Sequence, residues 1–120
     1  MNTSELLDAN LHGIFGNRDA TTRRATAESA YAPDVVFLDP EGRLEGRDAV
    51  LEKAAALLEG APETFVFAED GHRYVSDGTG ALPWAFGPEG EPVVRGIDVI
   101  TVHDGVISSI TTILLEGQTT

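Results

Sequence analysis

The pattern of apolar residues changes at Pro62, and this change limits the fold more than any other feature of the sequence. Before Pro62, apolar residues recur at helical spacing. After it, short β-rich runs alternate with turn residues. Helices followed by hairpin-connected strands predict an α+β domain, with three helices over the concave side of a curved antiparallel sheet. We expect one domain over residues 1–120 and a pocket enclosed between the two layers.

Start and stop signals place the three predicted helices. The first covers 5–16, with Asn2 and Glu5 spaced as a capping pair. The second begins at Asp19 or Thr21 and ends near 31–32, because Pro33 follows. The third runs from near Asp48 to Gly60. Between the second and third helices we expect a short strand over 35–38 and a turn over 39–42.

Turn residues divide the second half of the chain into strands. The predicted runs are 63–70, 72–76, 81–86, 93–102 and 105–115. His103-Asp104-Gly105 joins the last two runs as a hairpin, since Asp-Gly supplies the positive φ of a tight turn. Pro83 and Gly96 interrupt two strands, and we interpret both as bulges that bend the sheet.

Composition excludes several classes of function. Eight Lys and Arg against twenty Asp and Glu give a net charge of −12, which repels phosphate backbones and anionic lipid. We therefore expect neither a nucleic-acid nor a membrane partner. The absence of cysteine excludes thiol nucleophiles, iron–sulfur clusters and Cys-ligated zinc. The N-terminus lacks a signal-peptide pattern and no apolar run approaches membrane length, so we expect a soluble cytoplasmic protein.

Two acidic residues stand in apolar surroundings. Asp39 ends the segment VVFLDP, and Asp98 lies inside VVRGIDVITV. Side chains alternate between the two faces of a strand, so the sequence alone does not decide whether Asp98 faces the core or solvent. If it points inward, burial raises its pKa and favours a protonated carboxyl that can donate a hydrogen bond. Asp39 has a purely structural alternative, in which its side chain accepts a hydrogen bond from the turn that begins before Pro40.

The chain resembles the SnoaL-like and ketosteroid-isomerase-like branch of the nuclear-transport-factor-2-like superfamily. The segments VVFLDPEGRLEGRDAV, GALPWAF and VVRGIDVITVHDGVISSI carry the similarity, which extends over almost the whole chain. It implies a cone-shaped fold with a pocket and a homodimer formed through the convex sheet face. In the isomerases, the acid before the proline is the general base, so that role falls to Asp39. A neutral aspartic acid on a later strand donates to the oxyanion, so that role falls to Asp98.

In the isomerases a tyrosine on the first helix is a second donor to the oxyanion, and the sequence departs from the isomerase pattern at this position. The first-helix tyrosine of those enzymes corresponds to Leu11, and the third-helix tyrosine of some members corresponds to Ala54. Tyr31 matches the tyrosine found before the first strand. His12 lies one position from Leu11, and it either replaces the missing donor or flanks the apolar stripe.

We predict a pocket for a flat, apolar ligand with a carbonyl group. Trp84 and Phe86 lie on one side of their strand by period two. These two rings could equally be ordinary core, and the resemblance favours the pocket for Trp84. The predicted lining comprises Trp84, Phe86, Phe37, Tyr31, His12 and Leu57.

The predicted function is proton transfer on an enolisable ketone, of the steroid-isomerase or polyketide-cyclase type. The cyclases need no tyrosine donor, so they fit somewhat better. A noncatalytic ligand-binding module of the same fold is the alternative. An epoxide hydrolase ranks third, because Arg95 and Asp98 are three residues apart and share a face only if Gly96 forms a bulge. We expect no cofactor and no metal, since His72 and His103 lie in turns without ligand spacing.

Overall fold

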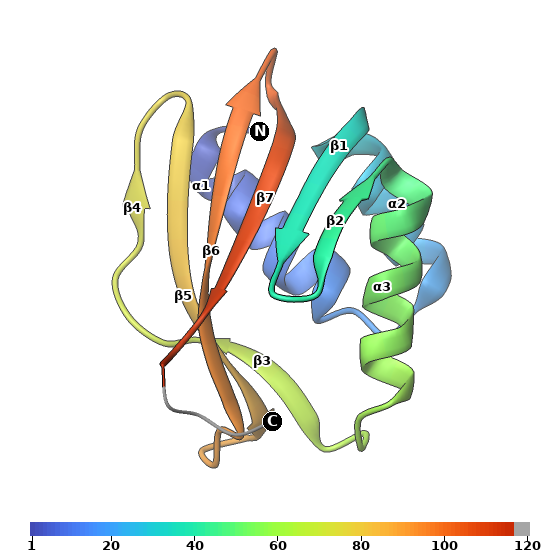
Figure 1. Ribbon diagram of the computed structural model, residues 1–120, viewed down its shortest axis with the longest axis vertical. Coiled ribbons are helices and arrows are strands. Elements are labelled where there is room, and N and C mark those ends of the chain that lie inside the picture. The colour runs from blue at the N-terminus through green and yellow to red at the C-terminus, as the bar shows by residue number, and fades with distance from the viewer. Residues whose placement is uncertain (117–120) are drawn as a thin grey trace.

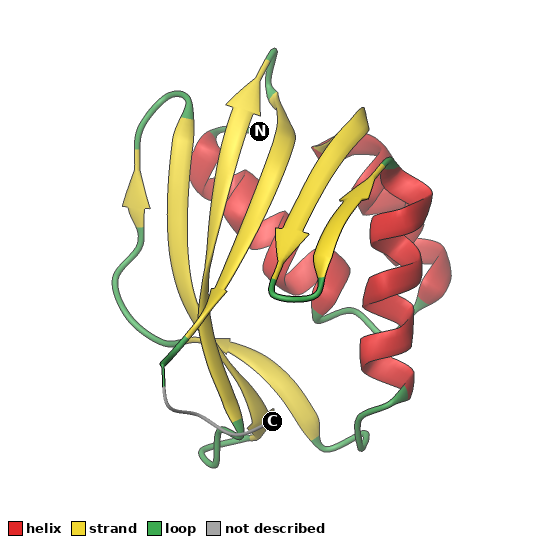
Figure 2. Ribbon diagram, viewed as in Figure 1, coloured by secondary structure: helices red, strands yellow, loops and turns green. Residues whose placement is uncertain are grey.

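A curved, seven-stranded sheet with helices packed on one side forms the fold (Figure 1 and Figure 2). The computed structural model describes residues 1–116. The helical elements are α1 Thr3–Asp8, η1 Ala9–Phe15, α2 Ala20–Ala30 and α3 Arg47–Glu59. The strands are β1 Tyr31–Asp39, β2 Gly42–Glu45, β3 Phe65–Glu69, β4 Tyr74–Val75, β5 Thr79–Pro88, β6 Val94–His103 and β7 Val106–Leu114.

The strand order is β2-β1-β7-β6-β5-β3, with β4 paired to β5. The predicted α+β class with a curved sheet is confirmed. One pairing differs from the expected antiparallel pattern, because β1 runs parallel to β7. The chain leaves β1 through β2 and α3 and completes the rest of the sheet before β7 returns alongside β1. This crossover makes the sheet mixed, and it places residues from the two ends of the sequence side by side.

The three helical segments begin and end close to their predicted residues. Asn2 and Glu5 form the expected capping box, and Asp19 accepts hydrogen bonds from the first turn of α2. The second half of the first helical segment is a π-helix, η1, which the sequence pattern did not indicate. Gly46, with φ of +95°, allows the chain to turn from β2 directly into α3.

Two details of the strands correct the sequence prediction. β2 was not expected, and β1 begins at Tyr31 rather than at 35. The predicted bulges at Pro83 and Gly96 are wrong, because the β5–β6 register continues unbroken from Thr79 to Phe86. Pro83 is tolerated because its carbonyl points towards Asp70, in the gap between β3 and β4. The N–H group that proline lacks would point into the same gap, so no hydrogen bond between paired strands is lost.

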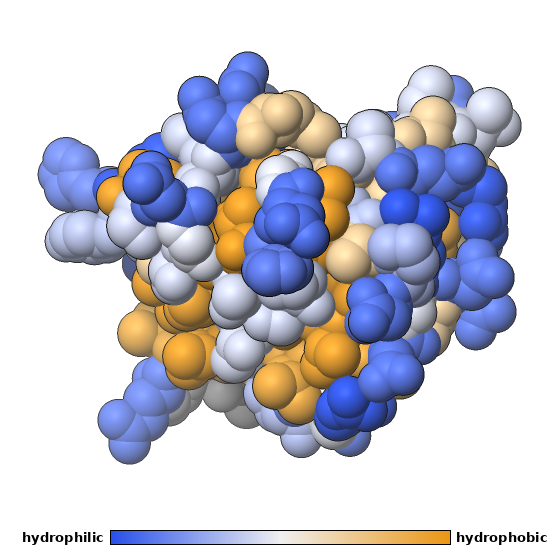
Figure 3. Space-filling model, turned by 90° about the horizontal axis from the view of Figure 1, so that it is seen from above, coloured by the Kyte–Doolittle hydropathy of each residue, from blue (hydrophilic) through white to orange (hydrophobic). Residues whose placement is uncertain are grey.

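The core lies between the concave face of the sheet and the helices. Its apolar members include Leu7 and Ile14 of the first helical segment, Val50 of α3, and Ile100 and Ile110 of the sheet. The opposite face of the sheet carries exposed apolar side chains, among them Leu38, Ile113 and Leu115. Seen from above, hydrophobic groups reach the surface between hydrophilic ones (Figure 3). None of the helices within residues 1–116 has the length and apolar composition that a membrane crossing requires.

Candidate functional site

Asp98 points inward and is held by three hydrogen bonds. The residue is 7% exposed. Its Oδ1 accepts from Trp84 Nε1 at 2.9 Å and from Thr112 Oγ1 at 2.8 Å. Its Oδ2 accepts from Asn10 Nδ2 at 3.1 Å. The Tyr31 hydroxyl in turn donates to Asn10 Oδ1 at 2.5 Å. The side-chain direction that the sequence left open is therefore inward, and Asp98 lies at the centre of a buried polar network.

Opposing effects set the ionisation of this network. Burial raises the pKa of Asp98 to about 6, while the hydrogen bonds from Thr112, Trp84 and Asn10 favour the carboxylate and limit the rise. Burial also raises the pKa of Tyr31 well above its ordinary value, and the nearby charge of Asp98 adds to this effect. Tyr31 therefore stays protonated and acts as a donor at neutral pH. Asp98 changes charge close to the physiological range.

Sheet register and a glycine bring the partners of Asp98 together. Thr112 lies directly opposite Asp98 in the β6–β7 pair. Trp84 is paired with Gly96, two residues before Asp98 on the same face. A Cβ at Gly96 would lie 2.7 Å from Trp84 Cζ2. The glycine predicted to bend the sheet instead leaves room for the indole ring, whose N–H then reaches the carboxylate.

Asn10 is the partner that sequence reasoning missed. The expected counterpart of the isomerase tyrosine, Leu11, is buried in the apolar core, and Asn10 reaches Asp98 instead. Asn10 lies in the π-helix, three residues after Leu7 and four residues before Ile14. A signal was present, because a polar residue at this spacing falls on the apolar stripe of the helix. Such a residue is buried and needs a hydrogen-bond partner.

Asp39 is held at the end of β1 by an ion pair. Its Oδ2 lies 2.5 Å from Lys53 Nζ of α3, and the two side chains are 11% and 21% exposed. Its Oδ1 accepts from the Glu41 backbone N–H at 2.9 Å. The turn-starting geometry considered for Asp39 is thus present, together with a cation that the sequence analysis did not identify. The pair lies between the interior and solvent.

Lys53 has further neighbours that fix its position. Its ammonium group also lies 2.6 Å from Glu41 Oε1 and 5.7 Å from the centroid of the Phe37 ring. Burial lowers the pKa of Lys53, but hydrogen bonding and charge attraction from Asp39 and Glu41 outweigh this effect and raise it overall. Lys53 is therefore a cation at neutral pH.

Strand register relates the two acids to each other. In the parallel pair, Phe37 lies beside Ile110 and Leu38 beside Thr111. Asp39 follows the last paired residue and, two residues after Phe37, lies on the same face as Phe37 and Ile110, which is also the face of Asp98 and Thr112. Asp39 and Asp98 thus occupy the same face of the sheet on β1 and β6, with β7 between them.

Four of the predicted lining residues are buried together in the core. Tyr31, Phe37, Trp84 and Phe86 are at most 6% exposed. Phe67 stacks on Phe86 with ring centroids 4.2 Å apart and meets Trp84 edge-on, and Phe15 stacks on Phe37. These side chains and the two acids face the same interior.

His12 and Leu57 require a correction. Both are exposed, Leu57 by 38%, so they do not line the interior beside Asp98. His12 instead lies with Asp8 and Glu69 on the surface, where their possible metal-ligating atoms are within 4.8 Å of one another. Arg73 donates to both carboxylates of this group, so one cation already offsets part of their negative charge.

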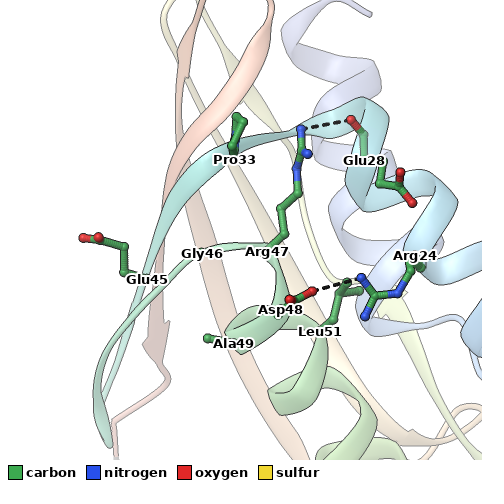
Figure 4. Close-up of a pocket in the computed structure, with 9 residues that line it drawn as sticks. All are labelled: Arg24, Glu28, Pro33, Glu45, Gly46, Arg47, Asp48, Ala49 and Leu51. Carbon is green, nitrogen blue, oxygen red and sulfur yellow. Dashed lines mark hydrogen bonds and ion pairs between the residues drawn. The ribbon is translucent and has the colours of Figure 1, made fainter.

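A surface depression lies elsewhere. It has a volume of about 560 Å³ and opens between α2, β2 and the start of α3 (Figure 4). Its lining is charged rather than apolar. Arg24 pairs with Asp48, and Arg47 donates to the backbone carbonyls of Glu28 and Tyr31. The depression contains none of the predicted site residues.

The arrangement required for an epoxide hydrolase is not formed. Arg95 is exposed and its Nε lies 3.5 Å from Asp70, whereas Asp98 is buried. Without a bulge at Gly96, the odd spacing sends Arg95 and Asp98 to opposite faces of the sheet.

Comparisons with known proteins agree with this architecture. The model of the SnoaL-like domain matches residues 13–110. A protein of Agrobacterium tumefaciens, provisionally named an isomerase of the SnoaL-like family, has a crystal structure that superposes with a TM-score of 0.84. The two are 21% identical, over 93% of this chain and 96% of that chain.

Two further crystal structures carry names of related activities. A protein from Jannaschia, provisionally named a SnoaL-like polyketide cyclase, has a TM-score of 0.75 at 15% identity, over 92% of this chain and 83% of that one. A protein from Kribbella flavida, provisionally named a ketosteroid isomerase, has a TM-score of 0.72 at 18% identity, over 97% and 79%. No curated protein matches the sequence. At these identities the structures show the fold alone, whereas the domain match covers most of the chain, and the protein therefore belongs to the SnoaL-like domain family.

Proposed function

We propose that the protein catalyses proton transfer on an enolisable, largely apolar ketone, as an isomerase or a cyclase. The observation that carries this proposal is the placement of Asp39 and Asp98 on one inward face of the sheet, two strands apart. Proton abstraction next to a carbonyl needs a base near the carbon and a donor near the oxygen. Two carboxyl groups in different surroundings can divide these tasks.

Asp39 is the proposed base. It lies at the boundary with solvent, where a substrate can reach it, and the Glu41 amide and Lys53 hold its carboxylate in one orientation. The proton leaves the α-carbon for Asp39, and the electron pair of the C–H bond moves into the enolate. The same carboxyl group can then return the proton to another carbon.

Asp98 is the proposed donor to the enolate oxygen in its protonated form. Burial favours that form, with a pKa of about 6, and negative charge developing on a nearby substrate favours it further. Oδ2 accepts from Asn10 alone, whereas Oδ1 accepts from both Trp84 and Thr112. Oδ2 is therefore the oxygen with room for a proton.

The proposed substrate is apolar because partly buried apolar side chains lie beside the polar network of Asp98. Leu114 lies two residues beyond Thr112 on the same face and is only partly buried against the core. Phe65 and Val94 are also partly buried there. These side chains can contact a hydrophobic ligand whose carbonyl group points inward.

Deuterium exchange tests this function without knowledge of the natural substrate. The protein is incubated in D₂O with 2-tetralone or with a 3-oxo-Δ5 steroid, and loss of the α-proton signal is followed by NMR. We expect the protein to accelerate exchange and Asp39→Asn to lower the protein-catalysed rate at least about 100-fold. Asp34→Asn, on the same strand but exposed, is the matched control and should keep the rate.

A noncatalytic ligand-binding module is the second candidate. The observation that favours it is the pairing of both acids within the protein, Asp39 with Lys53 and Asp98 with three donors. Binding of the ketones without any acceleration of exchange would support this module. Equal exchange by the wild type and Asp39→Asn would remove Asp39 from the mechanism.

A further inference from the structure

Lys53 is the charged residue nearest to the proposed base, and it was not part of the sequence-based site. Its Nζ lies 2.5 Å from Asp39 Oδ2. Its ammonium group lies over the Phe37 ring, 5.7 Å from the ring centroid, and the side chain is 21% exposed. An ammonium group next to a base is suited to hold negative charge that forms when the base acts.

Resting on the proposed function, we propose that Lys53 is a catalytic residue whose ammonium group donates to the substrate's carbonyl oxygen while Asp39 removes the α-proton. Lys53 would supply the oxyanion donor that the first helical segment lacks, since Leu11 is a core residue there. Lys53 and Asp39 would then act on neighbouring atoms of the same substrate.

The geometry of a ketone matches the geometry of this pair. An α-carbon and its carbonyl oxygen are about 2.4 Å apart, given the usual C–C and C=O bond lengths. Asp39 Oδ2 and Lys53 Nζ are 2.5 Å apart. A carboxylate that reaches the α-proton therefore brings the ammonium group within hydrogen-bonding reach of the oxygen, about 2.6–3.2 Å.

The second partner of Lys53 can give way to a substrate. Glu41 is 81% exposed, so its carboxylate can return to water when a carbonyl oxygen takes its place. Exposed ion pairs of this kind contribute little to stability, about 0–1 kcal/mol. Asp39, by contrast, is held by both Lys53 and the Glu41 amide, and it can keep its orientation during the exchange of partners.

The proton and charge balance of the step is complete. The α-C–H bond breaks, its proton forms an O–H bond with Asp39, and the electron pair forms the C=C bond of the enolate. The enolate oxygen carries the negative charge and accepts a hydrogen bond from Lys53, which keeps its own proton. Return of the proton from Asp39 to carbon restores both residues.

Lys53→Met tests the proposal through the direction of the rate change. If Lys53 stabilises the enolate, deuterium exchange should fall about 100- to 1,000-fold, as for loss of one oxyanion donor. If Lys53 only forms an ion pair with Asp39, its removal takes away no contact with the substrate, and exchange should stay equal or rise. Lys53→Arg should restore part of the rate.

A binding measurement separates this proposal from the proposed function. 2-Naphthol serves as an analogue of the enolate, and its ionisation when bound is followed by absorbance over a pH series. We expect the wild type to lower the pKa of the bound naphthol and Lys53→Met to lower it less. This result would support Lys53 as an anion-stabilising group even if no ketone exchanged.

Exchange that depends on Asp39 but not on Lys53 would overturn the proposal for Lys53 and leave the proposed function standing. Absence of both exchange and naphthol binding would overturn both.

Discussion

Replacement of Asp98 by asparagine should change how stability depends on pH. Asp98 has a pKa of about 6 in the folded protein and an ordinary value of 3.8 in an unfolded chain. Each pH unit between these values corresponds to about 1.36 kcal/mol, so the full difference is worth roughly 3 kcal/mol. The unfolded carboxyl loses its proton first as pH rises. Stability is therefore greatest below the unfolded pKa and is lost as pH increases through the folded pKa.

The asparagine variant removes this titration and retains the size of the side chain. The other acidic groups titrate in both proteins, so the difference between wild type and Asp98→Asn isolates the contribution of Asp98. Between pH 4 and pH 7.5, the wild type should lose roughly 2.5 kcal/mol of unfolding free energy relative to the variant. An amide among the donors Trp84, Thr112 and Asn10 also has a cost in stability, but this cost is the same at every pH. It therefore does not change the sign of the pH-dependent difference.

Urea unfolding at a series of pH values measures this difference. Circular dichroism reports the loss of secondary structure, and the single tryptophan, Trp84, reports the surroundings of Asp98 by fluorescence. An NMR titration of the Asp98 carboxyl carbon gives the folded pKa directly. A difference between the two proteins that stays constant across pH would refute the reasoning, because it would mean that Asp98 titrates alike in both states.

Two further predictions concern the neighbouring packing and the outer face of the sheet. Gly96→Ala should destabilise the protein by about 1–3 kcal/mol in urea unfolding and alter Trp84 fluorescence, because the new Cβ meets the indole ring and the Ile113 carbonyl; unchanged values would contradict the packing. We also expect a homodimer through the convex face, where Ile113 and Leu38 are exposed apolar side chains that a second copy can cover. Light scattering should show a dimer for the wild type and a monomer for Ile113→Lys, and a monomeric wild type would exclude this interface.

Local signals in the sequence were sufficient for most of the fold. Capping residues such as Asp19 fix where helices begin, and Asp104-Gly105 fixes the last hairpin through positive φ at both positions. Such features depend on neighbours a few residues away. The parallel pairing of β1 and β7 depends instead on contacts about 75 residues apart, and nothing in either strand alone specifies it.

The candidate site was only partly predictable for the same reason. Asp39 and Asp98 stood out because each is an acid in an apolar run, but their partners come from distant elements. Asn10 reaches Asp98 across 88 residues, from a π-helix whose altered spacing the sequence does not reveal. Lys53 lies on a helix face that periodicity assigns to solvent, and only the β1–β2 turn packed beside it shows its role.

The surroundings of the two acids differ in a way that separates their chemistry. Asp39 faces a cation, Lys53, so negative charge at that end of the site is compensated. Asp98 faces only the neutral donors Trp84, Thr112 and Asn10, and its burial is not balanced by a positive charge. A proton therefore has a place at Asp98 when negative charge develops nearby. A ketone between the two acids would meet a proton acceptor at one end and a proton donor at the other, which is the asymmetry that enolisation requires.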